Sequence, residues 1–280
     1  MNVPPALVAA LPRLRCPVCV AGLHLESHTL SCGSGHRFDV ARQGYLNLMV
    51  GAKAHPGDTA AMVAAREEFL GGGHYAPINR ALATLAAEHV PGARFVLDVG
   101  GGTGHYLAGV LDALPAADGV CLDTSVPALR RAARAHPRAA ALGADAWRSL
   151  PFADAVTDLV LTVFAPRGAA EVARILRPGG VWLLVTPLPG HLEQVREPLG
   201  MLGVEERKSD RLANDTEGFT PLVEREVVVE VELTRADLRA LVLMGPSAHH
   251  VEPGVLDARL TRLPDPQTVT VAVRLSAVTR

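Results

Sequence analysis

Three of the four cysteines and one histidine have the spacing of a metal site. Cys16 and Cys19 form a C-x2-C pair, and Cys32 and His36 follow as C-x3-H after twelve intervening residues. Two such knuckles present the four sulfur and nitrogen donors that a tetrahedral zinc ion prefers. Residues 22–32 alternate apolar and polar side chains, which favours a short β-hairpin between the knuckles. Because protein supplies all four ligands, we expect one structural zinc per chain, which drives folding of an N-terminal zinc ribbon. The alternative, two unrelated buried thiols beside a turn, leaves the spacing to coincidence.

The next residues able to do chemistry form a glycine-rich loop. An apolar strand over 95–99 contains Asp98 and runs into this loop, and a helical pattern starts at about His105. The loop glycines are Gly100, Gly101, Gly102 and Gly104. A strand, a glycine turn and a helix place backbone N–H groups beside a nucleotide-like ligand. The dinucleotide fingerprint needs glycine at position 105, so the pattern instead resembles motif I of S-adenosylmethionine-dependent methyltransferases. We therefore expect the loop and Asp98 to hold S-adenosylmethionine.

Acidic residues at the ends of later strands extend this site. Asp123 ends a predicted strand and stands nineteen residues beyond Gly104, where a carboxylate can accept both ribose hydroxyls of the donor. Asp145 follows a third strand and is placed to meet the adenine amino group. Either carboxylate alone could be a solvated strand end. Two of them in series after a glycine loop favour a methyl-donor site.

Strands and helices must alternate to bring these groups together. Apolar strands are predicted over 95–99, 118–123 and 155–166, with a third before Asp145 and a fifth after a Pro-Gly-Gly turn. This alternation predicts a parallel sheet covered on both faces, an α/β fold with a Rossmann-like methyltransferase domain. Residues 219–234 and 267–278 alternate as a long antiparallel pair would at the sheet edge.

Composition narrows the class of protein. Hydrophobic residues make up 49% of the 280 residues and charged residues 20%, which indicates a folded globular chain. No apolar run reaches the roughly 18 residues of a membrane span, and no basic leader precedes the first apolar stretch. So few cysteines favour a reducing cytoplasm over a disulfide framework. The net charge is −2, but residues 1–56, which include Lys53, carry +3, so the N-terminal part is suited to touching phosphate.

Several longer stretches together resemble one family. They are the cysteine cluster, "HRFDVARQGYLNLM", "PGDTAAMVAAREEFLGGGHYAP", "LDVGGGTGHY" and "TPLPGHL". In this order, from Cys16 to about His191, they resemble the 23S rRNA guanine-N1 methyltransferases, and "MGPSAHH" near Met244 extends the similarity more loosely. That family includes enzymes that protect antibiotic producers against macrolides such as tylosin.

The resemblance implies a function and further site residues. It implies methylation of N1 of a guanine in a 23S rRNA hairpin near the macrolide-binding exit tunnel, and macrolide (tylosin-type) resistance. The ribbon would take part in RNA recognition. The four residues of the cysteine cluster would be the zinc ligands, and Tyr75, Gly102, Thr103 and His191 match positions that contact the cofactor. Some relatives have cysteine where this chain has Gly101, a change of little consequence in a loop that works through its backbone.

The resemblance also suggests how the chain is divided. We expect a zinc-ribbon RNA-recognition module over 1–50, a helical connector over 51–92 and the methyltransferase domain over 93–280. Three glycines, Gly71 to Gly73, interrupt the connector and would bring Tyr75 over the donor pocket. The expected partner is a 23S rRNA hairpin, with no membrane, and a homodimer is an assembly that the chain could form.

The sequence does not identify the group that accepts a proton during the reaction. Guanine N1 loses a proton as it gains a methyl group, and Asp58, Asp145, His74 and His191 could accept it, with no spacing that selects one. Cys121 lies within a predicted strand as a core thiol, so no cysteine nucleophile is expected. No Asn-Pro-Pro-Tyr signature follows the fourth strand, which carries Phe164, Ala165 and Pro166 instead. Two alternatives remain: a small-molecule methyltransferase, which has no need of the ribbon, and a ribosome-binding module with an inactive cofactor domain, which would not bind the donor.

Overall fold

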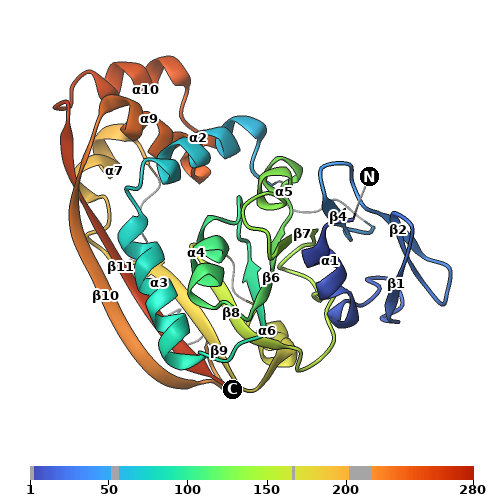
Figure 1. Cartoon of the computed structure of the whole chain (residues 1–280). Coiled ribbons are helices and arrows are strands. Elements are labelled where there is room, and N and C mark those ends of the chain that lie inside the picture. Colours follow the sequence, from blue (N-terminus) through green and yellow to red (C-terminus); the bar gives the residue numbers. More distant parts are fainter. Residues whose placement is uncertain (1–2, 52–56, 166–167, 202–215) are drawn as a thin grey trace.

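The computed structural model describes residues 3–51, 57–165, 168–201 and 216–280. Lys53 and Pro166 therefore lie outside the described residues. No helix within these ranges is long and apolar enough to traverse a lipid bilayer. Figure 1 shows one large sheet with the N-terminal strands at one end and the long C-terminal strands at the other.

An eight-stranded sheet runs through the molecule in the order β10-β11-β9-β8-β5-β6-β7-β4. Strands β4 to β9 pair in parallel, and their central members are buried along their length, as expected for a sheet covered on both faces. These strands are β4 (Tyr45–Asn47), β5 (Phe95–Val99), β6 (Asp118–Asp123), β7 (Ala139–Gly143), β8 (Thr157–Val163) and β9 (Leu176–Pro187). The predicted α/β alternation is confirmed.

The parallel register decides which loops meet. Val99 pairs with Leu122 of β6, and Asp98 pairs with Leu161 of β8. The three central strands, β5, β6 and β8, therefore all finish at the same end of the sheet, which we call its carboxyl edge. The glycine loop, Asp123 and the turn after β8 all emerge there.

On the side of the sheet opposite β4, the last two strands are an antiparallel pair, as predicted. They are β10 (Thr220–Leu233) and β11 (Gln267–Thr279). β11 in turn pairs antiparallel with β9. Along β10 the side chains alternate between half-buried and exposed. The exposed face carries an acidic row around Val228, consisting of Glu224, Glu226, Glu230 and Glu232.

Helices cover the two faces of the sheet. Successive residues of β5 show the alternation, because Val96 belongs to one apolar cluster and Leu97 to the other. Helices α3 (Ala76–His89), α4 (His105–Ala113) and α5 (Val126–Ala132) pack on the first face, and α1 (Pro5–Ala10) and α6 (Ala169–Ile175) pack on the second.

The zinc ribbon lies on the second face of the sheet. Its three-stranded antiparallel sheet comprises β1 (Leu23–Glu26), β2 (Thr29–Cys32) and β3 (Arg37–Asp39), so the predicted hairpin is confirmed. The flanking segments contact the large sheet. Helix α1, which is followed by a turn of 3-10 helix, η1 (Leu11–Arg13), packs on it, and β4 pairs in parallel with β7. The division at residue 50 stays a prediction, and packing contacts cross it.

The connector and the C-terminal helices cap the carboxyl edge of the sheet (Figure 1). Helix α2 (Ala60–Gly71) begins at Thr59, whose side chain accepts a hydrogen bond from the Met62 N–H, and it ends at the predicted glycine break. It packs against α9 (Arg235–Leu243). The remaining elements are α7 (Glu193–Leu199), η2 (Pro246–His249) and α10 (Pro253–Leu260).

Candidate methyl-donor site and zinc cluster

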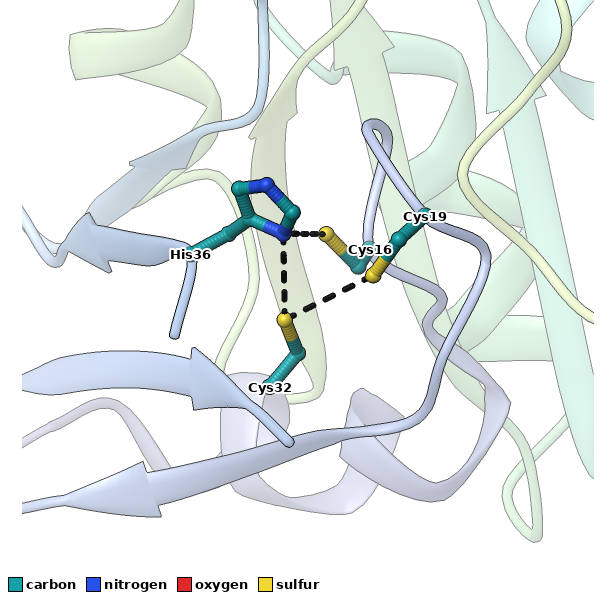
Figure 2. Close-up of side chains that lie close together, drawn as sticks. All are labelled: Cys16, Cys19, Cys32 and His36. Carbon is teal, nitrogen blue, oxygen red and sulfur yellow. Dashed lines mark hydrogen bonds between the residues drawn. The ribbon is translucent and has the colours of Figure 1, made fainter. Parts of the chain in front are cut away.

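The four predicted metal ligands converge in the ribbon. Figure 2 shows Cys16, Cys19, Cys32 and His36 pointing toward a common centre. Their ligand atoms all lie within 4.8 Å of one another. The Cys16 and Cys32 sulfurs lie 3.6 and 3.3 Å from His36 Nδ1, and the Cys19 and Cys32 sulfurs are 3.6 Å apart.

These separations fit zinc. With Zn–S bonds of about 2.3 Å and Zn–N bonds of about 2.0 Å, the S···N and S···S edges of a tetrahedron measure roughly 3.5 and 3.8 Å, within a few tenths of an ångström of the three distances above. The Ala21 N–H and neighbouring donors lower the pKa of Cys19 to about 6, which favours the thiolate that a metal needs. His24 lies off the cluster, next to Glu26 and Ser31. The cluster therefore has the donor set and the shape of a structural zinc site.

The glycine loop bends tightly around the end of β6. The N–H groups of Gly100 and Gly101 both donate to the Leu122 carbonyl, at 2.8 and 3.1 Å. Gly100, Gly102 and Gly104 have positive φ, and Gly104 begins α4. A Cβ on Gly101 would stand 2.5 Å from an Asp98 carboxylate oxygen, so the loop approaches the strand as closely as a backbone can.

Asp98 is fully buried beneath this loop. Neither carboxylate oxygen has a hydrogen-bond partner among the described residues. Burial and the nearby Asp123 carboxylate raise the pKa of Asp98 to about 7. A glycine loop that lines the cavity and leaves no room for a side chain above this buried acid fits the close backbone approach that S-adenosylmethionine needs.

Asp123 and Asp145 line a shared cavity of about 260 Å³. The Asp123 carboxylate accepts hydrogen bonds from the N–H groups of Gly102 and Ser125, at 2.9 and 2.8 Å. Asp145 is buried and accepts a hydrogen bond from the Trp147 N–H at 2.9 Å. The structure thus brings the two predicted strand-end acids to one pocket, which we call the acid pocket.

A second cavity of about 280 Å³ adjoins the acid pocket. We call it the apolar pocket, because Leu70 of α2, Leu241 and Val242 of α9 and other aliphatic and aromatic side chains line it. It contains Tyr75, Thr103 and His191, which the family resemblance singled out. Arg66, Gly100 and Phe164 line both cavities. Gly102, Gly104 and Asp98 lie behind the lining residues.

Tyr75 and His191 form a buried pair in the apolar pocket. The Tyr75 hydroxyl lies 3.2 Å from His191 Nε2, and His191 Nδ1 accepts a hydrogen bond from the Ala272 N–H at 3.2 Å. Burial, with Arg196 nearby, lowers the pKa of His191 to about 4, so the imidazole is neutral at neutral pH. With Nδ1 acting as the acceptor, the proton of the neutral ring resides on Nε2. Both ring nitrogens are engaged.

Sequence reasoning missed the role of Arg66. The guanidinium of this α2 residue lies 2.6 Å from an Asp58 carboxylate oxygen and donates to the Met244 carbonyl at 2.8 Å. A Cβ on Gly102 would stand 2.6 Å from Arg66 Nη1. A cation thus stands over the glycine loop. The only sequence signal was an arginine on a helix face that is otherwise apolar.

The comparisons with known proteins agree with this geometry. The N-terminal zinc-ribbon family model of RlmA matches residues 14–54, and a methyltransferase domain model matches residues 96–180. The "Putative 23S rRNA (guanine-N(1)-)-methyltransferase" of Micromonospora griseorubida is 49% identical over 95% of this chain and 97% of its own. The "23S rRNA (guanine(748)-N(1))-methyltransferase" of Streptomyces fradiae is 45% identical over 93% and 94%.

A solved structure supports the fold alone. One chain of the "Complex between the Haloferax volcanii Trm112 methyltransferase activator and the putative methyltransferase" is similar with a TM-score of 0.50 and 18% identity. The match covers 81% of this chain and 99% of that chain.

Replacing Cys16 by serine should remove the metal. The purified wild type should contain about one zinc per chain, and Cys16→Ser should contain much less, because a hydroxyl is a poor ligand for zinc. Cys121→Ala, which removes a buried thiol outside the cluster, should keep its zinc. Metal analysis by mass spectrometry checks this. Equal zinc contents in Cys16→Ser and the wild type would show that the cluster is not the zinc site.

Replacing Asp123 by alanine should weaken donor binding. Ribose hydroxyls left without their acceptor cost about 1–3 kcal/mol, or roughly 5- to 150-fold in affinity for S-adenosylmethionine. Asp118→Ala, at the opposite end of β6, is the matched control and should bind as the wild type does. Titration calorimetry measures both. Unchanged affinity in Asp123→Ala would show that the ribose lies elsewhere.

The similarity to the two relatives extends over nearly their full length and includes the ribbon, the connector and the donor fold. The resemblance predicted from the sequence is confirmed. The chain belongs to the family of S-adenosylmethionine-dependent 23S rRNA (guanine-N1)-methyltransferases.

Proposed function

We propose that this protein methylates N1 of a guanine in a 23S rRNA hairpin near the macrolide-binding exit tunnel, and that the modification protects its host against tylosin-type macrolides. The observation that carries the proposal is the presence of a donor-type glycine loop and an RNA-family zinc ribbon on one chain. The relative from Streptomyces fradiae is named for guanine 748, which supports one defined target nucleotide. We place the reaction in the cytoplasm, where ribosomes work.

The two adjoining cavities suggest how the donor is held. Asp123 would accept the ribose hydroxyls and Asp145 the adenine amino group, both in the acid pocket. Arg66 supplies a positive charge for the methionine carboxylate, next to Gly100 and Thr103. Tyr75 and His191 would close the far side. When bound, S-adenosylmethionine supplies an electrophilic methyl group on a sulfonium.

The proton acceptor is constrained by the structure. His191 is a poor candidate because both of its ring nitrogens are engaged. Asp58 is paired with Arg66. His74 lies 2.9 Å from an Asp237 carboxylate oxygen and is not part of the wall of either cavity. Asp145 lines the acid pocket, on the side proposed for adenine. Positioning of the guanine against the donor is therefore the main contribution that the described side chains make.

The decisive experiment maps the product. Wild-type protein incubated with 23S rRNA and methyl-labelled S-adenosylmethionine should label one guanine, and a methyl group on N1 should stop reverse transcriptase there, because N1 takes part in base pairing. Labelling at an atom that takes no part in base pairing, such as guanine N7, would leave no stop. Absence of labelling, with donor binding intact, would favour the ribosome-binding alternative, and transfer to small molecules alone would favour the other alternative.

The ribbon arginines divide into two kinds. Arg13 donates to the Ala9 carbonyl and lies 4.5 Å over the Phe95 ring, and Arg15 donates to the Leu14 carbonyl. The guanidinium groups of these two residues are therefore engaged in contacts within the protein. Arg37 has an exposed side chain paired with Glu26, and Arg42 is exposed. We therefore propose Arg37 and Arg42 as the phosphate contacts of the ribbon.

Removing Arg37 and Arg42 together should weaken RNA binding in a salt-dependent way. The double alanine variant should raise KM for RNA at low salt and reduce the slope of log affinity against log salt by about 1–2, as expected for two lost phosphate contacts. S-adenosylmethionine affinity should not change. Arg225→Ala, on β10, is the control for lost charge. A wild-type KM from low to moderate salt would place the RNA contacts elsewhere on the protein.

A further inference from the structure

We propose that Phe164 is the surface on which the target guanine stacks next to the methyl donor. The proposal rests on the proposed function, because it assigns a place to the base that is methylated. Phe164 follows β8 directly and lines both the acid pocket and the apolar pocket. The donor proposed above has its ribose and adenine in the acid pocket and its methionine part beside the apolar pocket, so a side chain on the wall of both cavities stands near the sulfonium that joins these parts and carries the methyl group.

The exposure of Phe164 calls for a ligand. Its side chain is 44% exposed, although its neighbours on β8 are buried. An aromatic ring left partly in water at the mouth of two cavities keeps apolar area that a flat, apolar partner can cover. A nucleobase is such a partner, because every base has a π-face that stacks on an aromatic side chain.

The backbone of Phe164 is held in an unfavourable conformation. Its φ is 54°, in the left-handed region that favours glycine and is uncommon for a bulky side chain. Its N–H donates to the Val185 carbonyl at 3.2 Å, which fixes the turn after β8. Strain of this kind persists where the surrounding structure enforces it, and it concentrates at ligand sites. The turn thus presents the ring to the two cavities although its backbone conformation is unfavourable.

The Phe164 ring also packs against two other rings of the apolar pocket. It stacks on the His191 imidazole with ring centres 5.9 Å apart and an interplanar angle of 28°, and it lies 6.2 Å from the Tyr75 ring. His191 is itself fixed by the Ala272 N–H and the Tyr75 hydroxyl. The three rings lie together as one aromatic wall. A base that leaves its own stack in the RNA would regain stacking on this wall, which offsets part of the cost of extruding it.

A series of substitutions tests the aromatic face of residue 164. Methylation of a 23S rRNA hairpin fragment is measured for the wild type, Phe164→Tyr, Phe164→Leu and Phe164→Ala, with S-adenosylmethionine affinity measured separately without RNA. Phe164→Tyr should stay near the wild type. The leucine and alanine variants should lose about 5- to 150-fold in kcat/KM for RNA, the equivalent of ~1–3 kcal/mol for one stacked base. Donor affinity should change much less. Val228→Ala, on the exposed face of β10, should have no effect.

A stability measurement separates a ligand surface from a packing residue. Phe164→Gly relaxes the left-handed backbone, so its thermal unfolding temperature should not fall, while its RNA methylation should fall as in the alanine variant. A large drop in unfolding temperature would make Phe164 a packing residue and overturn the proposal. Full activity of Phe164→Leu, or a loss explained by donor affinity alone, would also overturn it. A wild type that binds the donor but methylates no guanine would reject the proposed function and the stacking surface together.

Discussion

The Leu122 carbonyl accepts hydrogen bonds from two consecutive glycine N–H groups, and this contact joins the end of β5 to the end of β6. It exists because the two strands run in parallel and in register, with Val99 beside Leu122. Once the loop is tied there, the N–H of Gly102 reaches the Asp123 carboxylate. Gly101 is pressed against Asp98, so no side chain larger than hydrogen fits without movement. The shape of both cavities depends on this short turn.

The zinc ribbon is built into the same core as the sheet. Cys16, Cys32 and Phe38 of the ribbon belong to one buried cluster with Phe95 and Trp182 of the central strands. Strand β4 extends the large sheet beyond β7, so the chain leaves the ribbon already attached to the donor domain. The ribbon is consequently held in a fixed orientation to the donor site by packing. An RNA bound at the ribbon would therefore be placed relative to the methyl donor without a separate closing step.

The sequence predicted those parts of the site that depend on local spacing. C-x2-C and C-x3-H are short-range patterns, and the glycine loop with its strand-end acids follows from strand–turn–helix alternation. The parts it missed depend on contacts between distant segments. Arg66 meets Met244 across 178 positions of sequence, and β4 joins β7 through residues far apart in the chain. The left-handed turn at Phe164 has no sequence signal, because phenylalanine is a residue that ordinarily avoids this conformation.

The acidic row on β10 is partly neutralised by Arg274 of β11, which pairs with Glu224 and Glu226, but it still concentrates carboxylates at one end of the sheet. Glu224, Glu226, Glu230 and Glu232 lie on the exposed face of the strand at one end of the sheet, and the ribbon lies at the other (Figure 1). Residues 1–56 carry +3 and the remainder of the chain −5. In the field of a polyanion such a charge distribution would experience a torque, with the ribbon favoured to face the polyanion and the glutamate face to point away from it. The torque acts before any contact forms, over a range of about 10 Å at 0.1 M salt. Repulsion at one end of the sheet would thus add to attraction at the other in orienting the protein.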